Sequence, residues 1–469
     1  MDDGAVDRSR APVPLLFLVA DTGGGHRAAA RAIGEELGRL YPGRFAPVLC
    51  DPLGGPGSAR PLRWICGLYG PSVRLAPWLW GAAWHCTNSP AAIRLLQATL
   101  LRPARRPVAE AVRRHRPAAI VSLHPFTGAA AVAARQRQAP ATPVATVITD
   151  LITPHASWRG GPADILFLPT AEAGRRWRPP ASRPAQAGLP VAAAFRQGPA
   201  GARERAALGW SLGVPNGRFL VLLTGGGEGC GGLARSAKAL LRRFDDVQVV
   251  AICGRNRRLR RRLDRLAERC GGRLTVRGFV DDMAAWLRCA DVLVGKAGPG
   301  MIAEATCCGV PLLLTSQLPG QERGNAAFVA AAGAGSYVRG ARRLAAEVGR
   351  LRTSPGALEA MRAASARLGR PAAATMIATQ LAELTEMAEL TESAELTESA
   401  GPAEMAELTG LTDPAGLAEL TEQAGPARLA GFTPPGSHAS AAQGSTGLPA
   451  RPAGPPVPVG APGAGASHA

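Results

Sequence analysis

Short, continuously apolar runs recur along the first part of the chain, and each ends at a glycine-rich or polar turn. These runs are Pro14–Ala20, Ala118–Leu123, Val144–Thr149 and Ile165–Leu168. Segments of this length that are apolar at every position are typical of strands buried on both faces of a parallel sheet. Because helical segments alternate with them, the pattern predicts an α/β domain with a doubly wound sheet.

A second series of the same kind begins after a stretch rich in proline and glycine. Its strands are predicted at Phe219–Leu223, Val247–Cys253, Leu274–Phe279, Asp291–Val294 and Pro311–Thr315. The prolines and glycines before it suit a connection between domains. The sequence therefore predicts a first domain at residues 14–190, a linker at 191–217 and a second domain at 218–370, preceded by a disordered N-terminus at residues 1–13.

The C-terminal part of the chain follows a different pattern. The pentapeptide AELTE begins at Ala382, Ala388 and Ala394, on a six-residue step. Six residues advance a helix by roughly 600°, so successive leucines point about 240° apart and form no single apolar stripe. Proline, glycine and alanine dominate the end of the chain. We therefore expect residues 371–469 to be an acidic, disordered tail without a core.

This tail masks the charge of the rest of the chain. It holds two of the 54 Lys and Arg and eleven of the 35 Asp and Glu, so residues 1–370 carry a net charge of +28, against +19 for the whole chain. Such a charge attracts an anionic membrane surface or nucleic acid, although arginine on solvated faces explains it equally well. The arginine run at Arg257–Arg262 has no aromatic neighbours, so we expect no nucleic-acid partner.

The cysteines and the N-terminal residues bear on the cellular compartment in which the protein is expected. The nine cysteines contain no C-x-x-C pair, which favours buried thiols in a reducing compartment over disulfides or zinc. The first thirteen residues do not form a signal peptide, and no apolar run reaches membrane-spanning length. We expect a cytoplasmic protein, either soluble or peripherally bound to a membrane.

Half of the eight tryptophans fall in one segment, between Arg60 and Arg102. They are Trp64, Trp78, Trp80 and Trp84, and prolines and arginines separate them. Indole rings settle at the level of lipid headgroups, where arginine meets phosphate. The segment therefore predicts contact with a membrane surface or a lipid acceptor; a tryptophan-rich core or an apolar lid is the alternative.

The loop after the first strand carries the clearest candidate for catalysis. Gly24 and Gly25 let the backbone approach a substrate, and His26 falls in the first turn of the next helix, at a sheet edge where ligands bind. Histidine suits proton transfer near neutral pH, so we predict that His26 is catalytic; the alternative is a helix cap or a packed side chain. Asp150 follows another strand at the same edge and is predicted to support catalysis or to brace its loop.

The second domain offers glycine turns that each lead from a strand into a helix. Backbone N–H groups and the positive end of a helix suit a diphosphate. The predicted residues are Gly225, Gly226, Gly227, Gly229, Gly298 and Gly300. Glu304, one turn into the second helix, is placed to bind ribose hydroxyls. Gln321, Glu322 and Asn325 supply the mixed donors and acceptors that recognition of a sugar requires.

Several motifs together resemble a known family. DTGGGHRAAARAI, TVITDLITPHASW, TGGGEG, GKAGPGMIAEA and the Gln-Glu-x-Gly-Asn pattern at Gln321–Asn325 are similar to the monogalactosyldiacylglycerol synthase and diacylglycerol glucosyltransferase group of glycosyltransferase family 28. The resemblance runs from about residue 14 to residue 335 and excludes the tail. It implies a GT-B fold, in which two doubly wound, Rossmann-like domains face each other across a cleft.

The resemblance also implies roles. A UDP-sugar donor binds the second domain, a lipid acceptor binds the first, and the anomeric carbon is inverted. His26 matches the family's base and Glu304 its ribose contact, while Gln321, Glu322 and Asn325 match its contacts to the donor sugar. No Asp-x-Asp occurs in the chain to hold a metal on the diphosphate, so we predict a reaction without metal or other cofactor.

The leading hypothesis is therefore a UDP-sugar-dependent hexosyltransferase that acts on diacylglycerol at the inner face of the plasma membrane. Glucose, galactose and N-acetylglucosamine all remain open as the sugar. Two alternatives remain: the same fold acting on a polyprenyl-linked wall precursor or a secondary metabolite, and a non-catalytic basic protein that binds lipid or nucleic acid.

Overall fold

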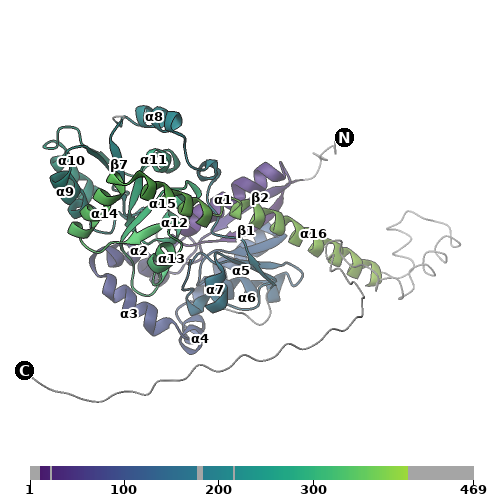
Figure 1. The fold of residues 1–469 in the computed structure, drawn as a ribbon. Coiled ribbons are helices and arrows are strands. Elements are labelled where there is room, and N and C mark those ends of the chain that lie inside the picture. Colours follow the sequence, from purple (N-terminus) through teal and green to yellow (C-terminus); the bar gives the residue numbers. More distant parts are fainter. Residues whose placement is uncertain (1–10, 22–23, 177–182, 215–216, 400–469) are drawn as a thin grey trace, which may run out of the picture. The chain divides into compact units, whose positions relative to one another are not determined.

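The computed structural model describes residues 11–21, 24–176, 183–214 and 217–399 (Figure 1). These residues form two parallel six-stranded sheets with helices packed on them. Two doubly wound sheets in sequence are the predicted fold class, which is confirmed. Residues 1–10 and 400–469, where disorder was predicted, lie outside the described residues.

The first sheet has the strand order β2-β1-β3-β4-β5-β6. Its strands are β1 (Val13–Leu18), β2 (Phe45–Cys50), β3 (Ala119–Ser122), β4 (Val144–Val147), β5 (Ile165–Leu168) and β6 (Arg183–Gln186). Successive side chains of a strand point to opposite faces, so Leu15 and Phe17 of β1 join one core and Leu16 and Leu18 another. This explains why β1 is apolar at every position.

The second sheet has the order β12-β11-β10-β7-β8-β9. Its strands are β7 (Phe219–Thr224), β8 (Val247–Ile252), β9 (Leu274–Arg277), β10 (Val292–Lys296), β11 (Leu312–Ser316) and β12 (Gly335–Tyr337). Leu220 and Leu222 face one core, and Val221 and Leu223 face the other. This sheet is therefore also covered on both faces.

The helices lie between the strands along the chain. In the first half they are α1 (Gly25–Leu40), α2 (Arg60–Leu75), α3 (Pro77–Thr87), α4 (Pro90–Ala98), α5 (Arg105–His115), α6 (Gly128–Gln138) and α7 (Ala171–Arg176), with 3-10 turns η1 (Arg102–Ala104) and η2 (Ala156–Trp158). After them come η3 (Ala193–Gln197), α8 (Ala202–Ser211), α9 (Leu233–Arg243), α10 (Arg257–Ala267), α11 (Met283–Cys289), α12 (Pro299–Cys307), α13 (Asn325–Ala331), α14 (Ala341–Thr353), α15 (Pro355–Leu368) and α16 (Ala373–Ser399).

The connection between the domains is shorter than predicted. Helix α8, inside the predicted linker, packs on the second domain: Arg205 forms an ion pair with Asp291 at 2.6 Å, and Leu208 and Val214 contact the core beneath it. Apolar side chains at these positions give the segment a surface to bury, which the count of prolines and glycines did not reveal.

Helix α16 corrects the prediction for the tail. Ile377, Ala378, Leu381 and Ala382 are fully buried in the core of the first domain, beside Ile33 of α1. Residues 373–399 are therefore helical, and their first part is not a disordered tail. The prediction applied the six-residue step of the repeat to the whole tail, whereas the buried positions largely precede the repeat and follow i, i+1, i+4, i+5 spacing, which makes one helical stripe.

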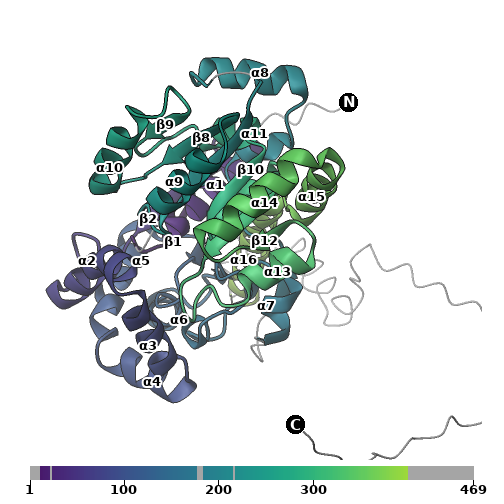
Figure 2. The same ribbon diagram turned by 60° about the vertical axis from the view of Figure 1, so that its left-hand side comes forward.

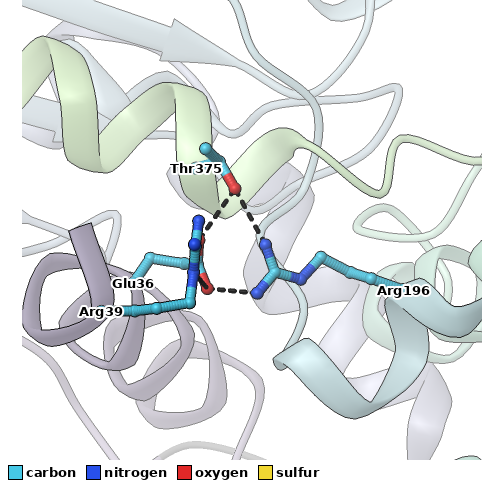
Figure 3. Close-up of polar contacts among 4 residues, drawn as sticks. All are labelled: Glu36, Arg39, Arg196 and Thr375. Carbon is cyan, nitrogen blue, oxygen red and sulfur yellow. Dashed lines mark hydrogen bonds and ion pairs between the residues drawn. The ribbon is translucent and has the colours of Figure 1, made fainter. Parts of the chain in front are cut away.

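A buried carboxylate fixes α16 and η3 to α1. Glu36 accepts a hydrogen bond from Thr375 Oγ1 at 2.9 Å and pairs with Arg196 of η3 and Arg39, while Arg196 Nη1 donates to Thr375 Oγ1 at 2.9 Å (Figure 3). These contacts lower the pKa of Glu36 to about 2, because the arginines and the threonine hydroxyl stabilise the ionised carboxylate more than its burial opposes it. The linker and the C-terminal helix thus meet at one side chain of the first domain.

Three helices, α2, α3 and α4, form an insertion between β2 and α5. They lie together in Figure 2 and pack on one another. Prolines at the first or second position of each helix set where it begins. This insertion contains the tryptophan-rich segment identified in the sequence.

Candidate active site

The predicted site residues gather at the carboxyl ends of the strands. The strand order reverses between β1 and β3 in the first sheet and between β7 and β10 in the second. Ligands of open α/β sheets bind at such points. At or just after the ends of these four strands lie His26 in the first turn of α1, His124, the glycine turn after Thr224, and Lys296 at the end of β10.

His26 is buried at the start of α1, with 7% of its surface exposed. Gly24 adopts a left-handed conformation (φ 82°) that turns the chain into the helix. The ring Nδ1 lies 2.7 Å from the carbonyl oxygen of Leu123, to which it donates, and 3.1 Å from Thr149 Oγ1. With Nδ1 protonated, Nε2 is the basic atom of the ring.

Burial lowers the pKa of His26 to about 4, although the bond to Leu123 opposes this shift. The ring is therefore neutral at pH 7 and can accept a proton. The ring of His124 lies 4.6 Å away, centroid to centroid, and its pKa is lowered by burial and by the charge of His26. Two neutral imidazoles thus occupy the switch point of the first sheet.

Asp150 is buried after β4, with 3% of its surface exposed. Its oxygens accept hydrogen bonds from Trp158 Nε1 at 2.7 Å, His155 N at 3.3 Å and Gln321 Nε2 at 3.2 Å. Burial raises its pKa. Its partners make it a residue that positions the loop after β4 and Gln321, whereas Thr149 is the neighbour that contacts the His26 ring.

Two glycines in the turn after β7 are needed for the conformation of the turn itself. A Cβ at Gly225 would lie 2.0 Å from the carbonyl oxygen of Cys230, and one at Gly229 would lie 2.3 Å from that of Cys253, so both positions need glycine. The N–H of Gly229 donates to Gly226 O at 3.0 Å, and the N–H of Gly226 lies 3.3 Å from Thr224 Oγ1. In the described conformation the N–H groups of Gly226 and Gly229 thus bond within the turn, and Gly227 O accepts from Arg255 N. Binding of a diphosphate by Gly225, Gly226, Gly227 and Gly229 stays a prediction.

The same turn contacts the insertion of the first domain. Glu228 forms ion pairs with Arg74 of α2 at 3.5 Å and with Arg255 at 3.7 Å. A Cβ at Gly70 would lie 2.8 Å from Glu228 Oε2, so the end of the Glu228 side chain lies close against this turn of α2. Arg255 in turn lies 3.7 Å from where a Cβ on Gly24 would be, which brings the His26 loop beside the second domain.

Helix α12 begins at Pro299 with Gly298 as its N-cap, so the glycine turn leads from a strand into a helix as predicted. A Cβ at Gly300 would meet no heavy atom of the described residues within 4 Å, apart from its chain neighbours and its own helix backbone, so this glycine leaves space at the start of the helix. Glu304 lies one turn in, and burial raises its pKa to about 7. Near neutral pH its carboxyl group can therefore donate or accept a hydrogen bond.

The loop after β11 holds the other three predicted donor residues. Gln321 bonds to Asp150, and its Oε1 is buried. Asn325 is fully buried, and its Nδ2 donates to Ala297 O at 2.9 Å. Within the described part of the chain Gln321 Oε1 and Asn325 Oδ1 have no hydrogen-bond partner, so each is an acceptor still to be satisfied. Glu322 is 2% exposed and pairs with Lys296.

Two residues near this loop were not predicted from the sequence. Lys296 ends β10 and forms the ion pair with Glu322. Tyr69 of α2 packs edge-on against Trp80, with ring centroids 5.0 Å apart, and burial followed by the charge of Glu322 raises the pKa of its hydroxyl. Lys296 had a signal: it is one of only two lysines among 54 basic residues. Tyr69 carried no signal beyond its tryptophan neighbours.

The four predicted tryptophans differ in their exposure to solvent. Trp64 and Trp78 are 69% and 70% exposed. Trp84 instead lies against Gly320 of the donor loop, and its ring centroid is 5.3 Å from that of His155. The other large apolar side chains exposed in this segment are Ile65, Leu68, Leu75, Leu79, Leu95 and Leu100. The outer surface of the insertion is thus apolar, and its inner surface reaches the candidate site.

A cavity of about 250 Å³ lies between elements of the two domains, beside α12. Leu151, Thr170, Ile302, Thr306 and Arg370 are among its lining residues. None of the predicted site residues lines it, so the cavity is separate from the groups described above.

Two absences hold for the described residues alone. No group of three His, Cys, Asp or Glu side chains there is arranged to bind a metal ion, and the metal-free reaction stays a prediction. Across the same residues, no helix combines the length and the apolar character needed to cross a bilayer.

Solved structures share this fold. The glycotransferase of kitacinnamycin is 15% identical with a TM-score of 0.53, covering 80% of this chain and 100% of that one. MurG of Acinetobacter baumannii is 16% identical (TM-score 0.50, 79% and 100% covered), and a UDP-GlcNAc 2-epimerase from Neisseria meningitidis is 14% identical (0.52, 79% and 100%). Likeness at this level shows the GT-B fold alone, and the epimerase among them shows that the fold does not choose the reaction.

Family models match both domains. Residues 26–191 match monogalactosyldiacylglycerol (MGDG) synthase, and residues 220–377 match the glycosyltransferase family 28 C-terminal domain. The protein is therefore a glycosyltransferase of the GT-B class.

Curated relatives narrow the family. Probable monogalactosyldiacylglycerol synthase 2, chloroplastic, of Oryza sativa subsp. japonica is 34% identical over 356 residues, which cover 73% of this chain and 74% of the relative. Monogalactosyldiacylglycerol synthase 1, chloroplastic, of Arabidopsis thaliana is 29% identical over 400 residues, covering 80% and 71%. The chain belongs to the monogalactosyldiacylglycerol synthase family.

Proposed function

We propose that the protein transfers a hexose from a UDP-sugar to diacylglycerol at a membrane surface, with inversion at the anomeric carbon and without a metal ion. The observation that carries this proposal is the state of His26. Its Nδ1 donates to Leu123 O at 2.7 Å, which leaves Nε2 as an oriented, unprotonated acceptor at the switch point of the first sheet.

Inversion requires a single displacement. His26 Nε2 removes the proton of the acceptor hydroxyl while the hydroxyl oxygen attacks C1 of the sugar, and the bond from C1 to the diphosphate oxygen breaks. The leaving UDP gains negative charge, which the remaining backbone N–H groups of the glycine turn and the N-terminus of α12 offset. A base that is neutral before the step is what this chemistry needs.

The donor side supports the same proposal. The Glu304 carboxyl group, with a pKa of about 7, suits the ribose hydroxyls. The unsatisfied acceptors Gln321 Oε1 and Asn325 Oδ1 suit hydroxyl donors of a sugar. Because the relatives at about a third identity are named monogalactosyldiacylglycerol synthases, we propose UDP-galactose as the first donor to test.

The acceptor side is the insertion α2–α4. Its exposed apolar side chains stand among the exposed arginines Arg60, Arg63, Arg94 and Arg102, which suits an anionic membrane surface that delivers diacylglycerol. We propose peripheral binding at the inner face of the plasma membrane, with no nucleic-acid partner. The named relatives above are chloroplastic proteins, so the membrane is to be determined by experiment.

The test is release of UDP from a panel of UDP-galactose, UDP-glucose and UDP-N-acetylglucosamine, with vesicles containing diacylglycerol and phosphatidylglycerol. We expect release with one hexose donor, dependent on diacylglycerol and accompanied by a β-linked glycolipid when the donor is α-linked. The proposal is contradicted if UDP is released only when a polyprenyl phosphate is the acceptor, or if none of the three UDP-sugars releases UDP.

A further inference from the structure

Lys296 and Glu322 form a largely buried ion pair at the carboxyl end of the second sheet. Lys296 Nζ donates to Glu322 Oε1, and Glu322 Oε2 accepts from the backbone N–H of Leu318 at 2.7 Å. Removing two charges from water costs free energy that a single ion pair seldom repays. A stable fold alone is therefore a weak reason for this pair.

The pair lies among groups that suit phosphate. A Cβ at Gly298, the N-cap of α12, would lie 3.4 Å from Lys296 Nζ, and a Cβ at Gly231 would lie 3.8 Å from Lys296 Cβ. Ser316 Oγ lies 3.2 Å from that same Gly231 position. The Lys296 side chain thus starts beside Gly231, at its Cβ, and places its ammonium group beside Gly298 at the start of α12.

Unsatisfied polar atoms adjoin the same place. Within the residues the structure covers, Ser316 Oγ is buried and has no hydrogen-bond partner, and the fully buried Asn325, which bonds to Ala297 next to Gly298, leaves its Oδ1 without one. Buried polar atoms are rarely left in this state unless another group completes them. These atoms are independent of the ion pair and point to a ligand with both acceptors and hydroxyl donors.

The composition gives Lys296 a separate distinction. The chain uses arginine 52 times and lysine twice, at Lys238 and Lys296. An ammonium group is compact and binds phosphate as a point charge, whereas a guanidinium needs room for its planar fork. A lysine kept at a confined position in an arginine-rich chain indicates that the smaller cation is required there.

We propose that Lys296 binds the diphosphate of the donor. Before the donor binds, Glu322 pairs with the Lys296 ammonium group; donor binding breaks this pair and frees Glu322 Oε1 to bind the sugar. This inference rests on the proposed function, since it presumes a nucleoside diphosphate sugar. It assigns a donor-binding role to Lys296 and makes sugar recognition by Glu322 conditional on the diphosphate.

An exchange of partners and a purely structural ion pair predict opposite effects of a Glu322 substitution on UDP binding. If the pair only braced the loop, removing either charge would weaken donor binding. If Glu322 competes with the diphosphate for Lys296, removing the Lys296 charge weakens UDP binding, whereas removing the Glu322 charge strengthens it. Glu322→Gln keeps an oxygen for the N–H of Leu318, so the loop retains that contact.

The experiment is calorimetric titration of UDP and of uridine into the full chain and its Lys296→Met, Glu322→Gln and Lys238→Met variants. Lys238 lies exposed on α9 and is the matched control. We expect Lys296→Met to weaken UDP binding about tenfold or more with uridine binding unchanged, Glu322→Gln to tighten UDP binding while slowing transfer, and Lys238→Met to change neither.

The outcomes separate the two proposals. If the unmodified chain binds no UDP, the proposed function fails. If it binds UDP, but Lys296→Met binds it equally well or Glu322→Gln weakens binding as much as Lys296→Met does, the exchange is overturned and the proposed function stands. If Lys296→Met does not fold, the Lys296→Arg variant and the Lys296→Met/Glu322→Gln double variant replace it. The exchange is overturned if the double variant binds UDP as tightly as the unmodified chain.

Discussion

Gln321 Nε2 of the second domain donates a hydrogen bond to Asp150 Oδ1 of the first, at 3.2 Å. Nearby, Thr153 Oγ1 lies 3.0 to 3.2 Å from the carbonyl oxygens of Gly320, Gln321 and Arg323. The loop that is proposed to hold the donor sugar is therefore positioned by the loop after β4 of the other domain.

This link predicts how two substitutions differ. Gln321→Ala removes one of several hydrogen bonds between the domains together with the amide proposed to bind the sugar, so we expect a several-fold higher KM for the donor and little loss of stability. Asp150→Ala also leaves Trp158 Nε1 and His155 N without their acceptor, so we expect a loss of about 3 kcal/mol or more. Donor titrations and urea unfolding check both. Equal stability of the two variants would contradict this role of Asp150.

The buried stripe of α16 gives a second prediction. Ile377→Ala leaves a cavity in the core of the first domain and should cost about 2–5 kcal/mol. Leu390 lies on the same helix but is 71% exposed, so Leu390→Ala should change stability by about 0.5 kcal/mol or less. Thermal unfolding of the two variants is the measurement. If both are as stable as the unmodified chain, α16 does not belong to the core.

Stability should depend on pH through three buried histidines, His26, His124 and His155, because burial lowers the pKa of each. The pKa values of His26 and His155 are lowered from 6.5 to about 4, mainly by burial. Both are neutral above pH 6.5 in either state. As the pH falls from about 6.5 to 4, the unfolded chain binds protons that the folded chain does not, so stability is lost in that window, by about 3 kcal/mol for His26 alone.

Melting temperatures measured between pH 8 and pH 4 check this dependence. We expect a plateau above pH 6.5 and a fall below it. His26→Asn should show a shallower fall, because one of the three buried histidines is gone. A melting temperature that is constant from pH 7 to pH 4.5 would show that these histidines are not held neutral.

The exposed tryptophans predict where a membrane binds. Trp64→Ala/Trp78→Ala should weaken binding to vesicles of phosphatidylglycerol and phosphatidylcholine by about tenfold or more, because both indoles lose their place at the headgroups. Trp210 is 82% exposed on α8 of the second domain and is the matched control. Vesicle sedimentation compares the variants. Equal losses for Trp210→Ala and the double variant would mean that the insertion has no special role.

The sequence predicted the central strands better than the edges. The strands from β1 to β11 that are buried on both faces are apolar at nearly every position, so their pattern was sufficient. Of the four edge strands only β9 was predicted, from its apolar run. β2 (FAPVLC), β6 (RPAQ) and β12 (GSY) were not predicted, because an edge strand is defined by pairing with a neighbour as much as by apolar side chains.

The site shows a similar division. His26 and Glu304 were found because each follows a strand end in a recognisable motif. The pairing of Glu322 with Lys296 was not found, since it joins the loop after β11 to the end of β10, and the sequence does not give that distance. The glycines were found as a group, but only the structure separates those that pack against backbone, Gly225 and Gly229, from those that leave space.

The central claim is that His26 is the base in sugar transfer. The most direct measurement is the rate of galactose transfer from UDP-galactose to diacylglycerol vesicles by His26→Ala, alongside its affinity for UDP. We predict a rate lower by about 100-fold or more, with UDP affinity unchanged. Transfer by His26→Ala at the rate of the unmodified protein would contradict the claim.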